Sequence, residues 1–170
     1  LYKLYVYKGE NSESGDGQDA LERLAKKNNI PVVCHTDSPC LLDKMSGGRP
    51  HNGYILEASP LPRLPLTSLG SLTTDGIGFT VNLDYQSREE AAINGTSPFI
   101  TLPKSHNGQP RNPLILFLDS ILDPGNLGGI IRTASFLGIT AIALSTRNST
   151  PLSPVVLKAS AGASENVTLF

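Results

Sequence analysis

The sequence is poor in cysteine, in histidine and in charged residues, and each shortage argues against a class of protein. It has two cysteines, Cys34 and Cys40, so we expect no disulfide framework and favour a reducing, intracellular compartment. The histidines have no cysteine or acidic partners at metal-ligand spacing, so we predict no metal site. No Gly-x-Ser-x-Gly nucleophile elbow occurs either.

Excess positive charge and long apolar runs are also lacking. The formal net charge is -1, so a nucleic-acid partner would have to be bound by a local patch. No apolar run reaches the roughly 18–20 residues that span a bilayer, and we expect no membrane partner. The chain starts at Leu1 and stops in a strand-like segment at Phe170. We therefore expect that both ends are cut and that any targeting segment lies upstream.

Hydrophobic periodicity predicts an α/β fold class, with a small α/β domain over residues 1–62. In this domain, segments in which apolar and polar residues alternate, as in strands, are separated by segments with apolar residues at helical spacing. The predicted elements are a strand over 1–7, a helix over 18–28, a strand over 30–34, a helix from Asp37 or Ser38 to Met45, and a strand over 54–58.

The middle of the chain, residues 63–111, has a different composition. Proline, glycine, serine, threonine and asparagine are frequent there, and apolar periodicity is weak. Because prolines interrupt long elements, we predict a linker or an insertion, with one short strand candidate over 77–83.

Regular structure is predicted again over residues 112–170. The predicted elements are a strand over 114–118, a helix over 128–137, a strand over 140–144, a helix from Pro154 to about Ala161, and a final strand from near Asn166. Strands that alternate with helices in this way predict a parallel sheet.

The turn after the strand over 114–118 carries the strongest functional signal. Asn126 suits a helix N-cap, and Arg132 follows six residues later. A cation near a helix N-terminus is disfavoured by roughly 0.3–1 kcal/mol, so a structural Arg132 would need a carboxylate such as Asp119 or Asp123. In the alternative, ligands bind at the carboxyl ends of parallel strands and Arg132 faces an anion. The residues alone leave both interpretations open.

Two weaker signals accompany this turn. Gly125, Gly128 and Gly129 resemble an anion-binding turn, but they match neither the dinucleotide-binding pattern nor the P-loop. His51 stands alone in a turn before a strand, where a structural or solvated histidine is commoner than a catalytic one.

Two runs in the C-terminal part together resemble the SpoU/TrmH-type SPOUT RNA ribose 2′-O-methyltransferases, closest to the mitochondrial large-subunit rRNA branch. The first run is Asp123-x-x-Asn126-x-Gly128-x-x-x-Arg132-Thr133-Ala134, and the second extends from Arg147-Asn148-Ser149 to Ala163-x-Glu165. Near the N-terminus, Leu4-Tyr5-Val6-Tyr7, Ile30-Pro31-Val32 and His51-Asn52-Gly53-Tyr54 resemble the L30e-like substrate-binding domain of that family.

The resemblance implies methyl transfer from S-adenosylmethionine to a ribose 2′-hydroxyl, directed to guanosine, in large-subunit rRNA. It also implies a mitochondrial location and a homodimer for the full-length protein. Arg132 matches the arginine that engages the RNA phosphate and helps to deprotonate the 2′-hydroxyl, and Asn126 matches the asparagine that shapes the catalytic pocket. Arg132, His51 and Asn52 are the residues that we expect to contact RNA.

One departure from the family is large. Its second and third motifs, a Gly-x-Glu loop and a Ser-Leu-Asn-Val-Ser segment, form a trefoil knot that holds the cofactor, and neither occurs here. We therefore expect that residues 112–170 are the first part of the SPOUT domain and that the cofactor-binding residues lie beyond Phe170. The chain alone should then be inactive, with an exposed sheet edge, an exposed core face and poor solubility.

Two other functions compete with this interpretation. The first is a non-catalytic RNA-binding module, in which the N-terminal domain binds RNA. The second is a nucleotide-binding α/β domain of another kind, which an acidic residue on a later strand would favour by contacting a ribose.

Overall fold

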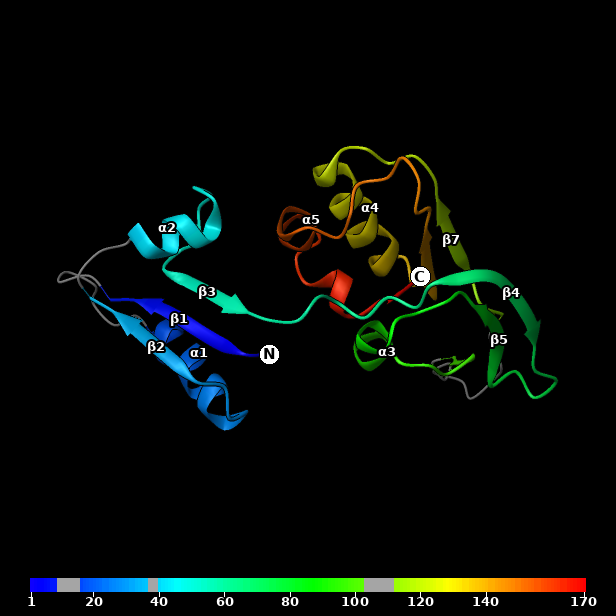
Figure 1. The fold of residues 1–170 in the computed structure, drawn as a ribbon, viewed down its shortest axis with the longest axis horizontal. Coiled ribbons are helices and arrows are strands. Elements are labelled where there is room, and N and C mark those ends of the chain that lie inside the picture. The colour runs from blue at the N-terminus through cyan, green and yellow to red at the C-terminus, as the bar shows by residue number, and fades with distance from the viewer. Residues whose placement is uncertain (9–15, 37–39, 103–111) are drawn as a thin grey trace. The chain divides into compact units, whose positions relative to one another are not determined.

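The computed structural model describes residues 1–8, 16–36, 40–102 and 112–170 (Figure 1). These residues form two compact units, Leu1–Pro60 and Leu61–Phe170. No helix within the described ranges is both long enough and apolar enough to cross a membrane.

The unit of residues 1–60 contains the three strands and two helices that the sequence predicts, and the strands form a mixed sheet. Strand β1 lies in the centre, parallel to β2 and antiparallel to β3. The proposed start of the second helix at Asp37 or Ser38 lies outside the described residues. The elements are β1 (Lys3–Tyr7), α1 (Asp16–Lys27), β2 (Val32–His35), α2 (Cys40–Ser46) and β3 (Tyr54–Glu57).

The core of this unit is small. Ala25 of α1 is buried against Leu4 and Val6 of β1. Its neighbours on the helix, Leu21 and Leu24, remain 47% and 55% exposed. Cys34 and Cys40 are both exposed, and they form no disulfide in the part of the chain that the structure describes.

The unit of residues 61–170 is built around a parallel sheet in the order β7-β8-β9. The predicted alternation of strands and helices is confirmed here. The most deeply buried side chains include Leu127, Ile131, Ile142 and Val156, which join the helices to the sheet. The elements are β7 (Ile115–Leu118), α4 (Pro124–Phe136), β8 (Ala141–Leu144), α5 (Pro154–Ala159), the 3-10 helix η1 (Ala163–Glu165) and β9 (Thr168–Leu169).

The middle segment, which the sequence predicts as a linker or an insertion, contains a second sheet. An antiparallel sheet in the order β4-β5-β6 extends over residues 66–101, and β5 confirms the short strand candidate. Residues 103–111 of the predicted linker lie outside the described ranges. The elements are β4 (Leu66–Leu72), β5 (Gly78–Leu83), α3 (Arg88–Asn94) and β6 (Phe99–Thr101).

Packing over long sequence distances holds this second sheet in place. Phe79 and Val81 of β5 are buried together with Ala141 of β8 and Phe170. The rings of Phe79 and Phe170 meet edge to face, with centroids 6.5 Å apart. Since side chains alternate along β8, Ala141 faces the second sheet while Ile142 packs in the α4 cluster. The parallel sheet therefore lies between a layer of helices and an antiparallel sheet (Figure 1).

Helix α3 begins with a reciprocal capping box. The Ser87 hydroxyl accepts a hydrogen bond from the Glu90 N–H at 3.2 Å, and a Glu90 carboxylate oxygen accepts one from the Ser87 N–H at 2.8 Å. The hydrogen bond from the Ser87 backbone, and then that with its side chain, lowers the pKa of Glu90 below its usual value of 4.5.

This capping box predicts an acid-sensitive contribution to stability. Because the folded state lowers the pKa of Glu90, its contribution is complete above the unfolded pKa and is lost as the pH falls through the folded value. Glu90→Gln retains an acceptor oxygen and removes the titration. Thermal unfolding followed from neutral to acidic pH should therefore show a smaller loss in the variant than in the natural chain. Parallel pH profiles would contradict the assignment.

Candidate functional site

Helix α4 begins four residues earlier than the sequence predicts, and Asn126 is not its N-cap. The N-cap is Asp123, whose Oδ1 accepts a hydrogen bond from the Asn126 N–H at 2.6 Å. Pro124 follows as the first helical residue, where the missing N–H has no cost. Both Asn and Asp suit an N-cap, so residue preference did not distinguish them. The capping interpretation of Asn126 is therefore wrong.

Arg132 lies in the third turn of α4 rather than in its first or second. It makes no ion pair or hydrogen bond with the residues that the structure describes, so neither Asp119 nor Asp123 is its partner there. Its guanidinium is exposed. The field of a helix terminus fades within one turn, so at this position Arg132 needs no compensating carboxylate.

The three glycines do not form an anion-binding turn, because all of them lie inside α4. A Cβ atom on Gly128 would lie 2.5 Å from the Ala159 Cβ and 2.7 Å from the Val156 carbonyl oxygen. Gly128 is therefore the position at which α4 and α5 approach each other. A Cβ atom on Gly129, in contrast, would meet nothing within 4 Å.

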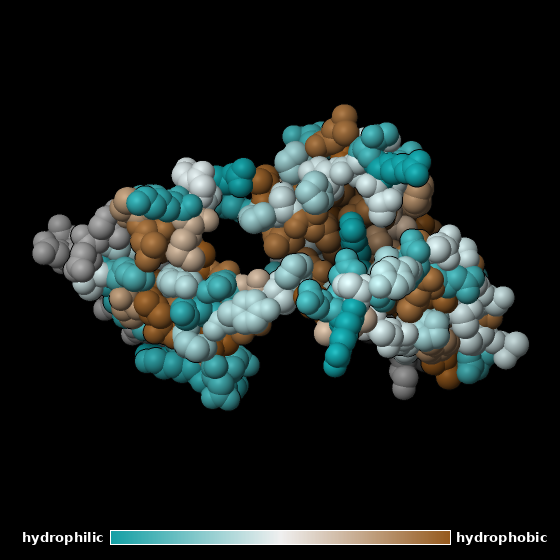
Figure 2. Space-filling model, viewed as in Figure 1, coloured by the Kyte–Doolittle hydropathy of each residue, from teal (hydrophilic) through white to brown (hydrophobic). Residues whose placement is uncertain are grey.

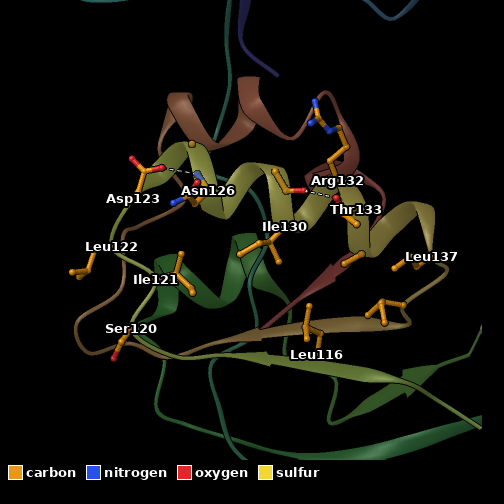
Figure 3. Close-up of a pocket in the computed structure, with 14 residues that line it drawn as sticks. Leu116, Ser120, Ile121, Leu122, Asp123, Asn126, Ile130, Arg132, Thr133 and Leu137 are labelled. Carbon is orange, nitrogen blue, oxygen red and sulfur yellow. Dashed lines mark hydrogen bonds between the residues drawn. The ribbon is translucent and has the colours of Figure 1, made fainter.

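A groove of about 930 Å³ extends along α4 and above β7 (Figure 3). Asn126 and Arg132 both line it, as do Asp123 and Thr133. The Thr133 hydroxyl donates to the Gly129 carbonyl oxygen at 3.0 Å. Most of the other lining side chains are apolar: Leu116, Ile121, Leu122, Ile130, Ala134, Leu137 and Ile139.

The two expected catalytic residues project in different directions from the helix. Six residues separate them, which on an α-helix is about 9 Å along the axis and about 120° around it. In Figure 3 the Arg132 side chain points away from Leu116 and the floor of the groove, whereas Asn126 lies at the opposite end, beside Asp123. The structure brings both residues to one groove but not to one point.

The groove is bordered by an unpaired strand edge. Strand β7 pairs only with β8 among the described strands, and several large apolar side chains in or beside β7 and α4 are exposed, of which Leu122 and Leu137 line the groove. Figure 2 shows such apolar residues at the surface. We expected this exposed edge and face, and the expected poor solubility stays a prediction. The exposed side chains are Leu114 (60%), Phe117 (66%), Leu122 (74%), Phe136 (89%) and Leu137 (66%).

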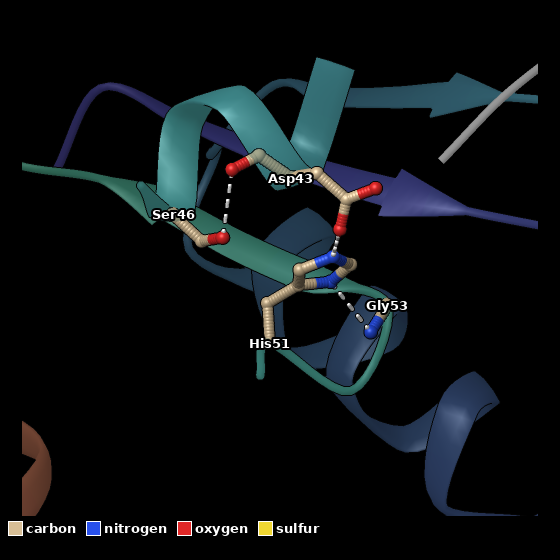
Figure 4. A network of polar contacts seen from close by, with 4 residues as sticks. All are labelled: Asp43, Ser46, His51 and Gly53. Carbon is tan, nitrogen blue, oxygen red and sulfur yellow. Dashed lines mark hydrogen bonds and ion pairs between the residues drawn. The ribbon is translucent and has the colours of Figure 1, made fainter. Parts of the chain in front are cut away.

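His51 lies in the turn that precedes β3, and both of its ring nitrogens form hydrogen bonds, one with α2 and one within the turn (Figure 4). The Gly53 N–H donates to Nδ1 at 3.1 Å, so the proton lies on Nε2, which donates to Asp43 Oδ1 at 3.1 Å. The Ser46 hydroxyl in turn donates to the Asp43 carbonyl oxygen at 3.0 Å. Asn52 is exposed with φ +52°. His51 therefore maintains the shape of this turn, and Asn52 is the side chain that the turn presents to solvent.

Metal ligands do not gather in the parts of the chain that the structure describes. No three histidine, cysteine, aspartate or glutamate side chains there lie close enough to hold an ion.

Comparisons with known proteins agree with the resemblance seen in the sequence. Residues 113–170 match the SpoU rRNA Methylase family. "rRNA methyltransferase 1, mitochondrial" of Dictyostelium discoideum is 36% identical over 152 residues, which are 88% of this chain and 27% of that protein. "23S rRNA (guanosine-2′-O-)-methyltransferase RlmB" of Pseudomonas putida is 47% identical over 57 residues, 34% of this chain and 23% of that protein. The chain thus spans about a quarter of the length of these relatives.

A solved structure shares the fold. The AdoMet-bound rRNA methyltransferase from Sinorhizobium meliloti superposes with a TM-score of 0.52 at 16% sequence identity. The match covers 99% of this chain and 45% of the other. The α/β fold class with a parallel sheet is confirmed by this likeness and by β7, β8 and β9.

Proposed function

Residues 113–170 belong to the SpoU rRNA methylase family, and on that premise we propose that this chain is part of an rRNA 2′-O-methyltransferase. Its reaction transfers a methyl group from S-adenosylmethionine to a ribose 2′-hydroxyl of large-subunit rRNA. One observation carries the proposal: within the matched stretch, Asn126 and Arg132 line one groove, and neither side chain has a partner among the described residues.

We also propose a target nucleotide and a location, which the names of two relatives support. The name of the Pseudomonas putida relative supports guanosine as the target, and that of the Dictyostelium discoideum relative supports a mitochondrial location. The homodimer that the resemblance implies stays a prediction. In the N-terminal unit, the turn of His51 and Asn52 is the RNA contact that we propose, with Asn52 exposed and His51 holding the backbone.

The role that we propose for Arg132 depends on the geometry of its guanidinium group as a hydrogen-bond donor. A ribose 2′-hydroxyl is a weak nucleophile, and it reacts well only when its position is fixed and its proton can leave. A guanidinium binds a phosphate through two parallel N–H···O bonds, which fixes the adjacent ribose. Because Arg132 and Asn126 point in different directions, we assign them to different groups of the RNA: Arg132 to the phosphate and Asn126 to the pocket around the reacting ribose.

The described residues do not provide a complete S-adenosylmethionine site. The molecule carries a carboxylate, an ammonium group and a sulfonium cation, whereas the groove is lined mainly by apolar side chains. Its charged lining residues, Asp123 and Arg132, lie at separate places along α4. When bound, the cofactor supplies the methyl group, and we propose that its contacts come from outside these 170 residues.

The direct test of this function is methyl transfer to large-subunit rRNA by the complete protein that carries these residues. Arg132→Ala removes charged hydrogen bonds and should lower the rate by about ten- to a hundredfold. Arg132→Lys should recover only part of the rate, because lysine keeps the charge but not the bidentate geometry. Arg88→Ala removes the same charge from another exposed arginine of this unit, outside both motif runs, and serves as the matched control.

Three outcomes would contradict the proposal. Equal losses in Arg132→Ala and Arg88→Ala would indicate general charge attraction rather than a specific phosphate contact. A fully active Arg132→Ala variant would remove Arg132 from the mechanism. RNA binding without any methyl transfer by the complete protein would favour the non-catalytic RNA-binding module.

A further inference from the structure

The loop between β7 and α4 is anchored on both sides at the carboxyl edge of the parallel sheet. The Ser145 N–H donates to the Leu118 carbonyl oxygen at 2.9 Å, and the Thr150 N–H donates to the Ile121 carbonyl oxygen at 2.8 Å. Between these two bonds, Ser120 adopts a left-handed conformation with φ +57°. These two hydrogen bonds connect the loop after β8 to the loop after β7. Asp123 follows the connected segment and is the N-cap of α4.

Asp123 is the N-cap of α4, although Asn126 nearby is also a residue type that caps helices. Its Oδ1 accepts from the Asn126 N–H at 2.6 Å, a short and charge-assisted hydrogen bond. Asparagine and aspartate side chains near helix starts readily bond to local backbone groups. With Asp123 as the acceptor, the Asn126 amide makes no hydrogen bond within the described residues and stays exposed at the groove.

We propose that Asp123 is a positioning residue for Asn126. Its carboxylate fixes the first turn of α4 and leaves the Asn126 side-chain amide available to a ligand in the groove. The ligand chemistry, an RNA ribose with its phosphates, rests on the proposed function; the positioning itself rests on the 2.6 Å hydrogen bond and the unpartnered amide.

One rival role for Asp123 requires its charge. The carboxylate also lines the groove, so it is placed to accept a proton or to repel an anion there. A serine side chain caps a helix as well as aspartate does but carries no charge. Asp123→Ser therefore keeps the helix cap and removes the negative charge, whereas Asp123→Ala removes both the cap and the charge. Asp119→Ala removes a nearby exposed carboxylate that caps nothing, and it is the matched control.

The experiment uses the 170-residue chain and two readouts. Hydrogen exchange of the Asn126 backbone amide, followed by NMR, reports the cap directly. The affinity for a short guanosine-containing RNA hairpin, compared with that for the same hairpin made of DNA, reports whether the Asn126 side-chain amide contacts the RNA. Asp123→Ala should speed the exchange by about fivefold and weaken RNA binding to the level of Asn126→Ala. Asp123→Ser and Asp119→Ala should leave both readouts close to those of the natural chain.

Each alternative result has a definite meaning. Unchanged exchange in Asp123→Ala would overturn the positioning role. Restored exchange but altered RNA affinity in Asp123→Ser would assign Asp123 to charge rather than to positioning. If the natural chain does not distinguish RNA from DNA, its groove does not select RNA, and the ligand assigned to the Asn126 amide is wrong; the proposed function is tested separately by methyl transfer with the complete protein. The exchange measurement would then still decide whether Asp123 holds the turn.

Discussion

Replacing Phe79 with alanine should lower the free energy of unfolding of the unit of residues 61–170 by about 3–5 kcal/mol. Phe79 is 3% exposed and its ring packs edge to face on Phe170. The truncation removes apolar contacts and leaves a cavity between the antiparallel and the parallel sheet, where Ala141 is too small to fill it. The measurement is equilibrium unfolding of the whole chain in urea, with the transition of each unit resolved by its own probe.

Phe136→Ala is the matched control, since Phe136 has the same side chain and is 89% exposed. Its removal should change the free energy of unfolding by less than about 0.5 kcal/mol. If the two variants unfold alike, then β4, β5 and β6 do not contribute to the core, which would favour a linker over an insertion for residues 63–111. A large loss for Phe79→Ala alone would establish the middle segment as part of the folded unit.

Replacing Gly128 with alanine should destabilise the same unit by about 1–3 kcal/mol, in spite of the better helix propensity of alanine. The new Cβ atom would lie 2.5 Å from the Ala159 Cβ and 2.7 Å from the Val156 carbonyl oxygen. Backbone atoms of α5 cannot move aside as a flexible side chain can, so α4 and α5 must separate. Thermal unfolding of the variant should show the loss.

Gly129→Ala, at the next position, should have the opposite effect on the stability of this unit. The added Cβ atom meets nothing within 4 Å, so only the helix propensity changes, and the variant should be stabilised by up to about 1 kcal/mol. Stabilisation by both substitutions would contradict the close approach of α4 and α5. Destabilisation by Gly128→Ala alone would confirm that this glycine serves packing, although its spacing in the sequence resembles an anion-binding turn.

Sequence periodicity predicted the parallel sheet well for a local physical reason. The runs that became β7 and β8 are short and continuously apolar, as is typical of parallel strands, and β8 is largely buried, although Phe117 of β7 is 66% exposed. Gly138, with φ +74°, follows the end of α4, as a glycine after a helix predicts. The spacing of Asn126 and Arg132 also carried the family resemblance, and the comparisons support that family for residues 113–170.

The site could be predicted only in part from the same residues. The sequence predicted a helix after β7, and the resemblance assigned Asn126 and Arg132 to the site. The structure shows that both side chains line one groove, and their catalytic roles stay predictions. The sequence did not identify the cap, because Asp123 and Asn126 have nearly equal N-cap preferences. The proline at position 124 was the signal that could have decided for Asp123, since proline favours the first helical position.

Other features of this protein depend on contacts between residues far apart in the chain. No local pattern shows that Phe79 will meet Phe170, or that Gly128 will meet Ala159. The antiparallel sheet of the middle segment exists because the second face of the parallel sheet buries its apolar side. Local periodicity thus predicts the helices and the parallel strands, and the resemblance of the two motifs indicates the residues to which we assign the proposed chemistry. Tertiary packing decides which faces are covered and which side chains line the groove with Asn126 and Arg132, because each depends on neighbours that the local sequence does not contain.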